Sequence, residues 1–283
     1  MIEIAPRHKR GLSLAGPMMN AAGFMGFADE YRSLVDFDVM GAFVTNPISA
    51  RSRTPARAAR LRDLGQGGAL IHTGLPNPGI RKAIQLYGRK WGAMRCPVLV
   101  HVAATTPAEV AECLELLETV EGAAGVELGL KDGLNPSEVA ELVAAAVQSG
   151  SLPIIVRVPF QDPVLAAEAA RSAGAVALTV SAPPRGALLA GSDERVTGRL
   201  VGPAFFPLAL NSVLSVIGRV DLPVIGSGGV HDAGSARIML TAGAVAVQVD
   251  GQIWRDPASL ERIAEAIAEA LSLTTPAAAH GQT

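Results

Sequence analysis

A glycine-rich turn at residues 226–229 is the clearest candidate for chemistry in this sequence. It reads Gly-Ser-Gly-Gly and lies between an apolar run and a helical pattern that begins near Asp232. Consecutive glycines let backbone N–H groups approach an anion, and the N-terminus of the following helix adds positive partial charge. The turn therefore predicts a phosphate-binding loop. A tight turn that holds no ligand is the alternative.

The cysteines and histidines are scattered. Cys96 and Cys113 have neither a disulfide nor a metal-binding spacing, and we expect both to be apolar core residues. No HExxH motif or other metal-ligand cluster occurs, so no metal site is expected. His72 and His101 could face a site, but nothing nearby in sequence orients either imidazole, which favours structural roles.

Composition excludes several classes of function. The net charge is -2, and the longest basic run is "RHKR" at residues 7–10, so nucleic-acid binding is not expected. No apolar run approaches the roughly 20 residues that span a bilayer, and the N-terminus lacks the apolar segment of a signal peptide. We expect no membrane association and a cytoplasmic location.

The elements that must position the turn alternate along the chain. Short runs rich in β-branched residues occur at 97–104, 124–130, 152–159, 175–181, 222–228 and 244–250, and two earlier candidate strands lie at 16–23 and 41–46. From residue 97 on, helical patterns separate them. Three of these helices begin with a polar residue before proline, at Thr106, Asn135 and Asp162, which predicts N-caps.

This alternation predicts parallel strands joined by right-handed crossovers, and eight strands suggest an α/β fold of the (β/α)₈ TIM barrel type. We expect one domain over residues 1–272 and a disordered tail at 273–283. The open doubly wound sheet is the alternative, but no GxGxxG follows the first strand. Residues 47–72 and 182–201 do not fit a bare barrel, so we expect insertions at its C-terminal face, where loops build active sites.

Six blocks in order give the chain a resemblance to a known family, over about residues 16–254. They are PMMNAAG, GAFVTNPIS, GLPNPG, VGPAFFPLAL, IGSGGV and GAVAVQV. The chain resembles the soluble class 1 dihydroorotate dehydrogenases, as a divergent member. The resemblance implies a barrel of the FMN-binding type, a role in pyrimidine biosynthesis and a homodimer. It assigns to the FMN site Ala22, Gly23, Asn46, Arg157, Gly202, Gly228, Gly229 and Gly251.

Within this resemblance, Ala22 and Gly23 pack against the isoalloxazine ring, and Gly202, Gly228 and Gly229 line the phosphate end. Asn46 and Arg157 each stand where the family has a lysine near the flavin. An arginine at that position keeps a fixed positive charge that could stabilise reduced flavin. A surface ion pair at the barrel rim is its other interpretation.

The family's catalytic thiol is absent. Where the family reads Asn-x-Ser-Cys-Pro-Asn, this chain reads GLKDGLN at residues 129–135. Lys131 or Asp132 could transfer the proton instead, together with Arg157 as a third catalytic candidate. An ordinary polar turn is the alternative for "KDG".

Substrate and phosphate contacts of the family also differ. Ile71 stands where a substrate asparagine is expected, and Ser181 or Ala182 where another is. Asp250 replaces a glycine beside the phosphate, where a carboxylate repels the ligand unless it turns toward Arg255 or solvent.

Three functions follow from these observations. The first is an FMN-dependent oxidoreductase that acts on dihydroorotate or on another small cyclic substrate. The second is a non-redox barrel that binds a phosphorylated metabolite. The third is a binding or assembly subunit without catalysis, for which the arginine-rich residues 51–62 could be a contact surface. Some relatives add an iron-sulfur and FAD subunit, but no cysteine cluster here binds such a centre.

Overall fold

Eight parallel strands form a closed barrel in the computed structural model, which describes all residues except 58–59, 66, 191–193 and 275–283. Their order is β3-β14-β13-β10-β9-β8-β7-β4. The seam closes between β3 and β4, where the Gly41 N–H donates to the Met18 carbonyl at 2.7 Å and Met19 pairs with Ala42. The predicted barrel is confirmed, and so are all eight predicted strands: β3 Met18–Asn20, β4 Phe43–Val44, β7 Val98–Val102, β8 Gly125–Gly129, β9 Ile154–Arg157, β10 Ala177–Val180, β13 Val224–Ser227 and β14 Ala246–Val249.

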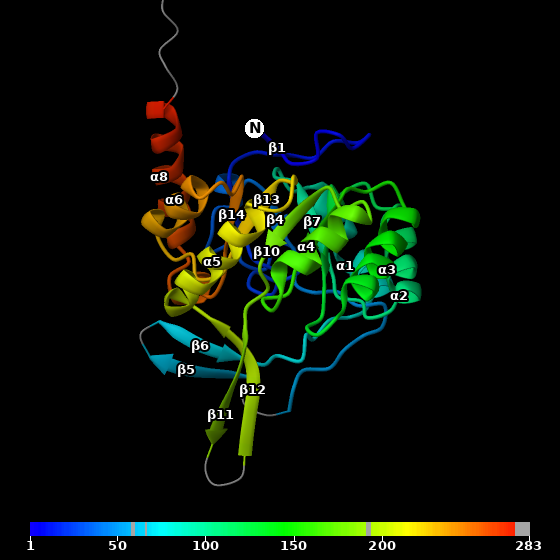
Figure 1. The fold of residues 1–283 in the computed structure, drawn as a ribbon, viewed down its shortest axis with the longest axis horizontal. Helices are drawn as coiled ribbons and strands as arrows, with labels where there is room; N and C mark the ends of the chain where they lie inside the picture. The colour runs from blue at the N-terminus through cyan, green and yellow to red at the C-terminus, as the bar shows by residue number, and fades with distance from the viewer. Residues whose placement is uncertain (58–59, 66, 191–193, 275–283) are drawn as a thin grey trace, which may run out of the picture.

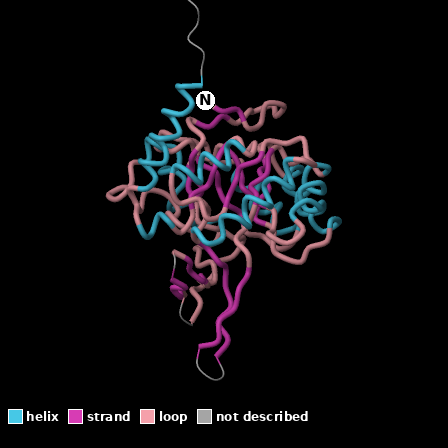
Figure 2. Tube along the Cα trace, turned by 60° about the vertical axis from the view of Figure 1, so that its left-hand side comes forward, coloured by secondary structure: helices cyan, strands magenta, loops and turns pink. Residues whose placement is uncertain are grey.

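Helices surround the barrel (Figures 1 and 2). They are α1 Ile80–Gly92, α2 Pro107–Leu117, α3 Pro136–Gln148, α4 Pro163–Ser172, α5 Phe206–Ile217, α6 Ala233–Thr241, α7 Gln252–Arg255 and α8 Ser259–Thr274, with 3₁₀ turns η1 Phe37–Val39 and η2 Pro203–Phe205. Over the described part of the chain, no helix combines the length and apolarity that crossing a bilayer requires. The one-domain division at residue 272 stays a prediction; α8 continues to Thr274, and the rest of the predicted tail lies outside the described residues.

Two of the three predicted helix caps are confirmed. Thr106 and Asn135 accept the N–H groups of Glu109 and Glu138, three residues into their helices. The prediction for Asp162 is wrong: its backbone is left-handed, with φ 48° and ψ 47°, and its side chain makes no cap hydrogen bond. An N-cap side chain reaches the helix N–H groups from an extended backbone, and aspartate tolerates the left-handed region that replaces it here.

The two predicted insertions meet in one antiparallel sheet, which the sequence did not indicate. Strands β5 Leu61–Gly65 and β6 Gly68–Ile71 come from the first insertion, and β11 Arg185–Ala190 and β12 Glu194–Val201 from the second. Their order is β11-β12-β6-β5, with Arg199 of β12 opposite Ile71 of β6. This sheet, here called the arm, projects from the mouth of the barrel (Figure 1).

A hairpin of β1 Ile2–Glu3 and β2 Ser13–Leu14 closes the opposite end of the barrel (Figures 1 and 2). Its buried Leu14 packs with Leu99 and Ile225 from inside the barrel. Because that end is filled by apolar side chains, polar chemistry is confined to the end that carries the arm.

Candidate active site

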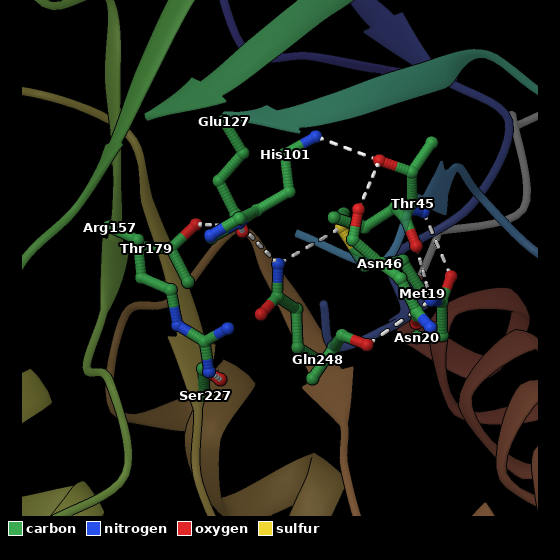
Figure 3. A network of polar contacts seen from close by, with 12 residues as sticks. Met19, Asn20, Thr45, Asn46, His101, Glu127, Arg157, Thr179, Ser227 and Gln248 are labelled. Atoms are coloured by element: carbon green, nitrogen blue, oxygen red, sulfur yellow. Dashed lines mark hydrogen bonds and ion pairs between the residues drawn. The ribbon is translucent and has the colours of Figure 1, made fainter. Parts of the chain in front are cut away.

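A network of polar side chains lies inside the barrel (Figure 3). Its centre is Glu127 of β8, which is fully buried. His101 of β7 lies with its Nδ1 2.7 Å from Glu127 Oε2, while Thr179 Oγ1 and Gln248 Nε2 donate to Oε1 at 2.9 and 2.7 Å. Three other strands thus each supply a partner to one carboxylate, which satisfies a charge that would otherwise be costly to bury.

The surroundings of Glu127 keep it ionised. Burial raises the pKa of this carboxyl, but the hydrogen bond and charge of His101, the charge of Arg157 and the hydrogen bond of Gln248 outweigh burial and lower the pKa to about 2. An ionised carboxylate only accepts hydrogen bonds, so the geometry assigns the donated proton to Nδ1 of His101. In the neutral imidazole, Nε2 then carries the free lone pair.

His101 Nε2 faces the mouth of the barrel. A Cβ added to Gly129, the last residue of β8, would lie 2.5 Å from this nitrogen. The missing side chain at Gly129 therefore makes room for the ring. Sequence reasoning favoured a structural His101 because no neighbour in the chain orients it; Glu127, 26 residues away, does so in the fold. The sequence signal that could have identified this pair is Glu127, a charged residue at a position of β8 that faces the barrel interior.

Arg157, predicted from sequence as both a flavin-site and a catalytic residue, is buried at the end of β9. Its Nη2 lies 3.5 Å from Ser227 Oγ, and its Nε makes no hydrogen bond within the described residues. Burial lowers the pKa of the guanidinium, while the charges of Glu127 and Asp250 raise it. Arg157 is therefore a buried cation with an unpaired donor, and no surface ion pair of the kind considered from the sequence forms with any described residue.

The loops after β3 and β4 hold three further predicted residues. Ala22 is buried, and a Cβ at Gly23 would meet only Pro47 Cδ, at an ordinary 3.9 Å. Asn46 fixes the shape of the first loop, since its Oδ1 accepts from Gly26 N at 3.1 Å and its own N–H donates to the Gly26 carbonyl. In this conformation the side-chain oxygen of Asn46 is bound to the backbone of its own loop.

Asp132, predicted as a proton-transfer residue, is held by the arm. Arg185 Nε donates to Oδ2 at 2.5 Å, and Arg199 contacts both oxygens at 2.9 Å. Burial raises the pKa of Asp132, but the two guanidinium groups reverse that effect and hold it below its ordinary value. A lower pKa makes a weaker base. Lys131, beside it, is exposed.

Other residues considered from the sequence lie away from this network. His72 is exposed, and Ile71 belongs to the arm. Cys96 and Cys113 are buried, as predicted, and burial raises the pKa of their thiols to about 11 and about 12. Neither thiol is therefore a nucleophile at neutral pH. No cluster of three or more His, Cys, Asp or Glu side chains that could hold a metal occurs among the described residues.

The predicted phosphate loop is occupied by the chain itself. The carboxylate of Asp250 accepts from Gly229 N at 3.0 Å and from the backbone of Gly251. Asp250 is 1% exposed, so it does not turn to solvent, and its Oδ2 points to the Gly229 amide; among the described residues it forms no ion pair with Arg255, the other orientation that would leave a phosphate undisturbed. The space left between this turn and the residues after β10 has a volume of about 10 Å³, which is room for about one water molecule.

Close packing of the chain explains the glycines around this turn. A Cβ at Gly202 would lie 2.1 Å from the carbonyl oxygen of Gly67, and one at Gly229 would lie 2.6 Å from Phe206 N. The helix N-terminus that follows is also satisfied internally, because Asp232 accepts from Ser235 N at 2.7 Å. The expected phosphate-binding turn is thus closed in this conformation by neighbouring backbone and by the carboxyl groups of Asp232 and Asp250.

The site fits only one end of the FMN that the resemblance implies. At the ring end, Arg157 Nε and Gln248 Oε1 are buried without hydrogen bonds in the described structure, which suits a polar heterocycle with donors and acceptors of its own. At the phosphate end, Asp250 holds the amides that would bind the anion. The ring end fits and the phosphate end does not fit while Asp250 keeps this position.

Comparison with known proteins gives a full-length match. The family model described as dihydroorotate dehydrogenase matches residues 8–271. The catalytic subunit of dihydroorotate dehydrogenase B (NAD(+)) from Pelobacter propionicus is 32% identical over 90% of this chain and 89% of its own length. The protein of the same name from Trichlorobacter lovleyi is 33% identical, over 92% and 91%. Because the family match covers residues 8–271, which include all eight barrel strands, the chain belongs to the dihydroorotate dehydrogenase family.

Proposed function

We propose that this protein is an FMN-dependent oxidoreductase that oxidises dihydroorotate or a related small cyclic substrate. FMN is the cofactor of the family, and when bound it accepts the hydride. The observation that carries the proposal is the buried cation Arg157 at the mouth of a barrel whose sequence matches catalytic subunits over nine-tenths of its length. A fixed positive charge in a site with little water stabilises negative charge that develops during the reaction.

We propose His101 Nε2 as the acceptor of the substrate proton. Its lone pair faces the mouth beside Gly129, and Glu127 both orients the ring and stabilises the imidazolium that forms. This is the arrangement in which a carboxylate makes histidine an effective base. Asp132 and Lys131 remain the other two candidates. The arginine contacts of Asp132 support a role in holding its loop against the arm.

The partners are proposed from the relatives. Their printed name is that of a catalytic subunit that uses NAD(+), so we propose that a second, electron-transferring chain carries electrons from this one to NAD⁺. A homodimer and a cytoplasmic location stay predictions. The arm offers a surface that such a chain could contact, since it projects beyond the barrel (Figure 1).

A second candidate is a binding subunit that carries no flavin. The position of Asp250 favours it, because this carboxylate holds the amide of Gly229 in the family's phosphate loop.

Anaerobic titration tests the proposed function. The protein is mixed with excess FMN and then with dihydroorotate, and the visible absorption of oxidised flavin is followed. We expect this absorption to bleach. His101→Asn should slow the bleaching by about 10²-fold or more, the usual contribution of a general base, and should remove a step from its pH profile.

The exposed His72 provides the matched control, and His72→Asn should react at the wild-type rate. Flavin that binds but stays oxidised would reject dihydroorotate as the substrate. Failure of any flavin to bind, at any concentration tested, would favour the binding subunit.

A further inference from the structure

Asp250 stands in the place of a ligand anion. Its carboxylate accepts hydrogen bonds from the backbone of Gly229, in the turn after β13, and of Gly251, after β14. In a barrel these are the two loops that most often hold a phosphate group. A carboxylate offers the same kind of oxygen acceptor as a phosphate, so it can satisfy the same N–H groups.

The turn satisfies only one of the two oxygens of Asp250. Oδ1 is buried and makes no hydrogen bond within the described residues. Burial raises the pKa of Asp250 above its ordinary value, and the bonds from Gly229 and Gly251 and the charges of Arg157 and His231 offset only part of that effect. Leaving one oxygen of a buried carboxylate without a partner is costly.

A phosphate at this turn would lack room, in addition to meeting the carboxyl group of Asp250. The cavity against Gly228, Gly229 and Asp250 is about 10 Å³. The backbone around it is closely packed, since a Cβ at Gly202 would lie 2.1 Å from the Gly67 carbonyl oxygen and one at Gly229 would lie 2.6 Å from the backbone N of Phe206. An anion at these amides therefore requires the side chain of Asp250 to move away from them.

We propose that the carboxyl group of Asp250 occupies the phosphate-binding amides and thereby removes the preference of this chain for a flavin that carries a phosphate. The inference rests on the proposed flavin site. A flavin without phosphate, riboflavin, presents the same ring to Arg157 and Gln248 and makes no demand on these amides. Wild-type protein therefore discriminates little between FMN and riboflavin.

Binding measurements on three proteins test this, with no catalytic readout. Quenching of flavin fluorescence gives the Kd of FMN and of riboflavin for wild type, Asp250→Gly and Asp250→Asn. We expect wild type to bind the two flavins within about threefold of each other. Asp250→Gly frees both charge and space, and two charge-assisted hydrogen bonds to the phosphate then tighten FMN binding at least about tenfold. Riboflavin binding stays unchanged.

Asp250→Asn removes the charge and keeps the volume, so its FMN affinity should lie between the other two. Asp250→Asn also keeps the test possible if Asp250→Gly does not fold. If wild type binds FMN tenfold or more tightly than riboflavin, and Asp250→Gly does not alter that ratio, the inference is overturned while the proposed function stands. If neither flavin binds to wild type or Asp250→Gly, both are overturned.

Discussion

Replacing Glu127 by glutamine removes the carboxylate that orients His101 and that, together with Asp250, acts on the buried cation Arg157. The pKa of Glu127 falls from an ordinary 4.5 to about 2 in the fold, which corresponds to about 3 kcal/mol of stability. Breaking a buried charge pair by removing one partner costs a similar amount, about 3–5 kcal/mol. We therefore expect Glu127→Gln to lower the free energy of unfolding at pH 7 by about 3 kcal/mol.

The pH dependence gives the sharper test. Because the folded pKa of Glu127 is depressed, its contribution is complete above pH 4.5 and is lost as the pH falls toward about 2. Urea unfolding, followed by the fluorescence of Trp91 and Trp254, should show a gap between wild type and variant that narrows below pH 4.5. The surface residue Glu112, paired with exposed Arg51, is the control. The Glu112→Gln variant should unfold at the same urea concentration as wild type. A gap under about 1 kcal/mol at neutral pH, or one that does not change with pH, would refute the reasoning.

Two further predictions concern the seam and the mouth of the barrel. A Cβ at Gly41 would lie 1.8 Å from the Gly16 carbonyl oxygen, so Gly41→Ala should lower the free energy of unfolding by more than about 2 kcal/mol. Gly218→Ala, where the nearest atom is 3.6 Å away, should leave it nearly unchanged in the same urea titration. If Asp132 holds its loop against the arm, Asp132→Asn and Arg199→Gln should slow flavin bleaching to a similar extent. A loss confined to Asp132→Asn would instead identify it as the proton acceptor.

Local patterns in the sequence determined the frame of this protein. Alternation of β-branched runs with helical runs predicted the last six barrel strands, two shorter candidates before them completed the eight, and the Thr-Pro and Asn-Pro pairs predicted two helix starts. Ordered family blocks predicted the family. These signals succeed because strand and helix preferences, and caps, depend on residues within a few positions of each other.

The partners of the polar side chains were decided only by the tertiary structure. His101 meets Glu127 because β7 and β8 are neighbours in register, and Asp132 meets Arg199 because two insertions join in the arm. Asp250 turns onto Gly229 because β13 and β14 end side by side. The barrel brings together polar residues 21 to 121 positions apart, and a buried charge must then take whichever partner the other strands supply. No pattern within one segment contains that information.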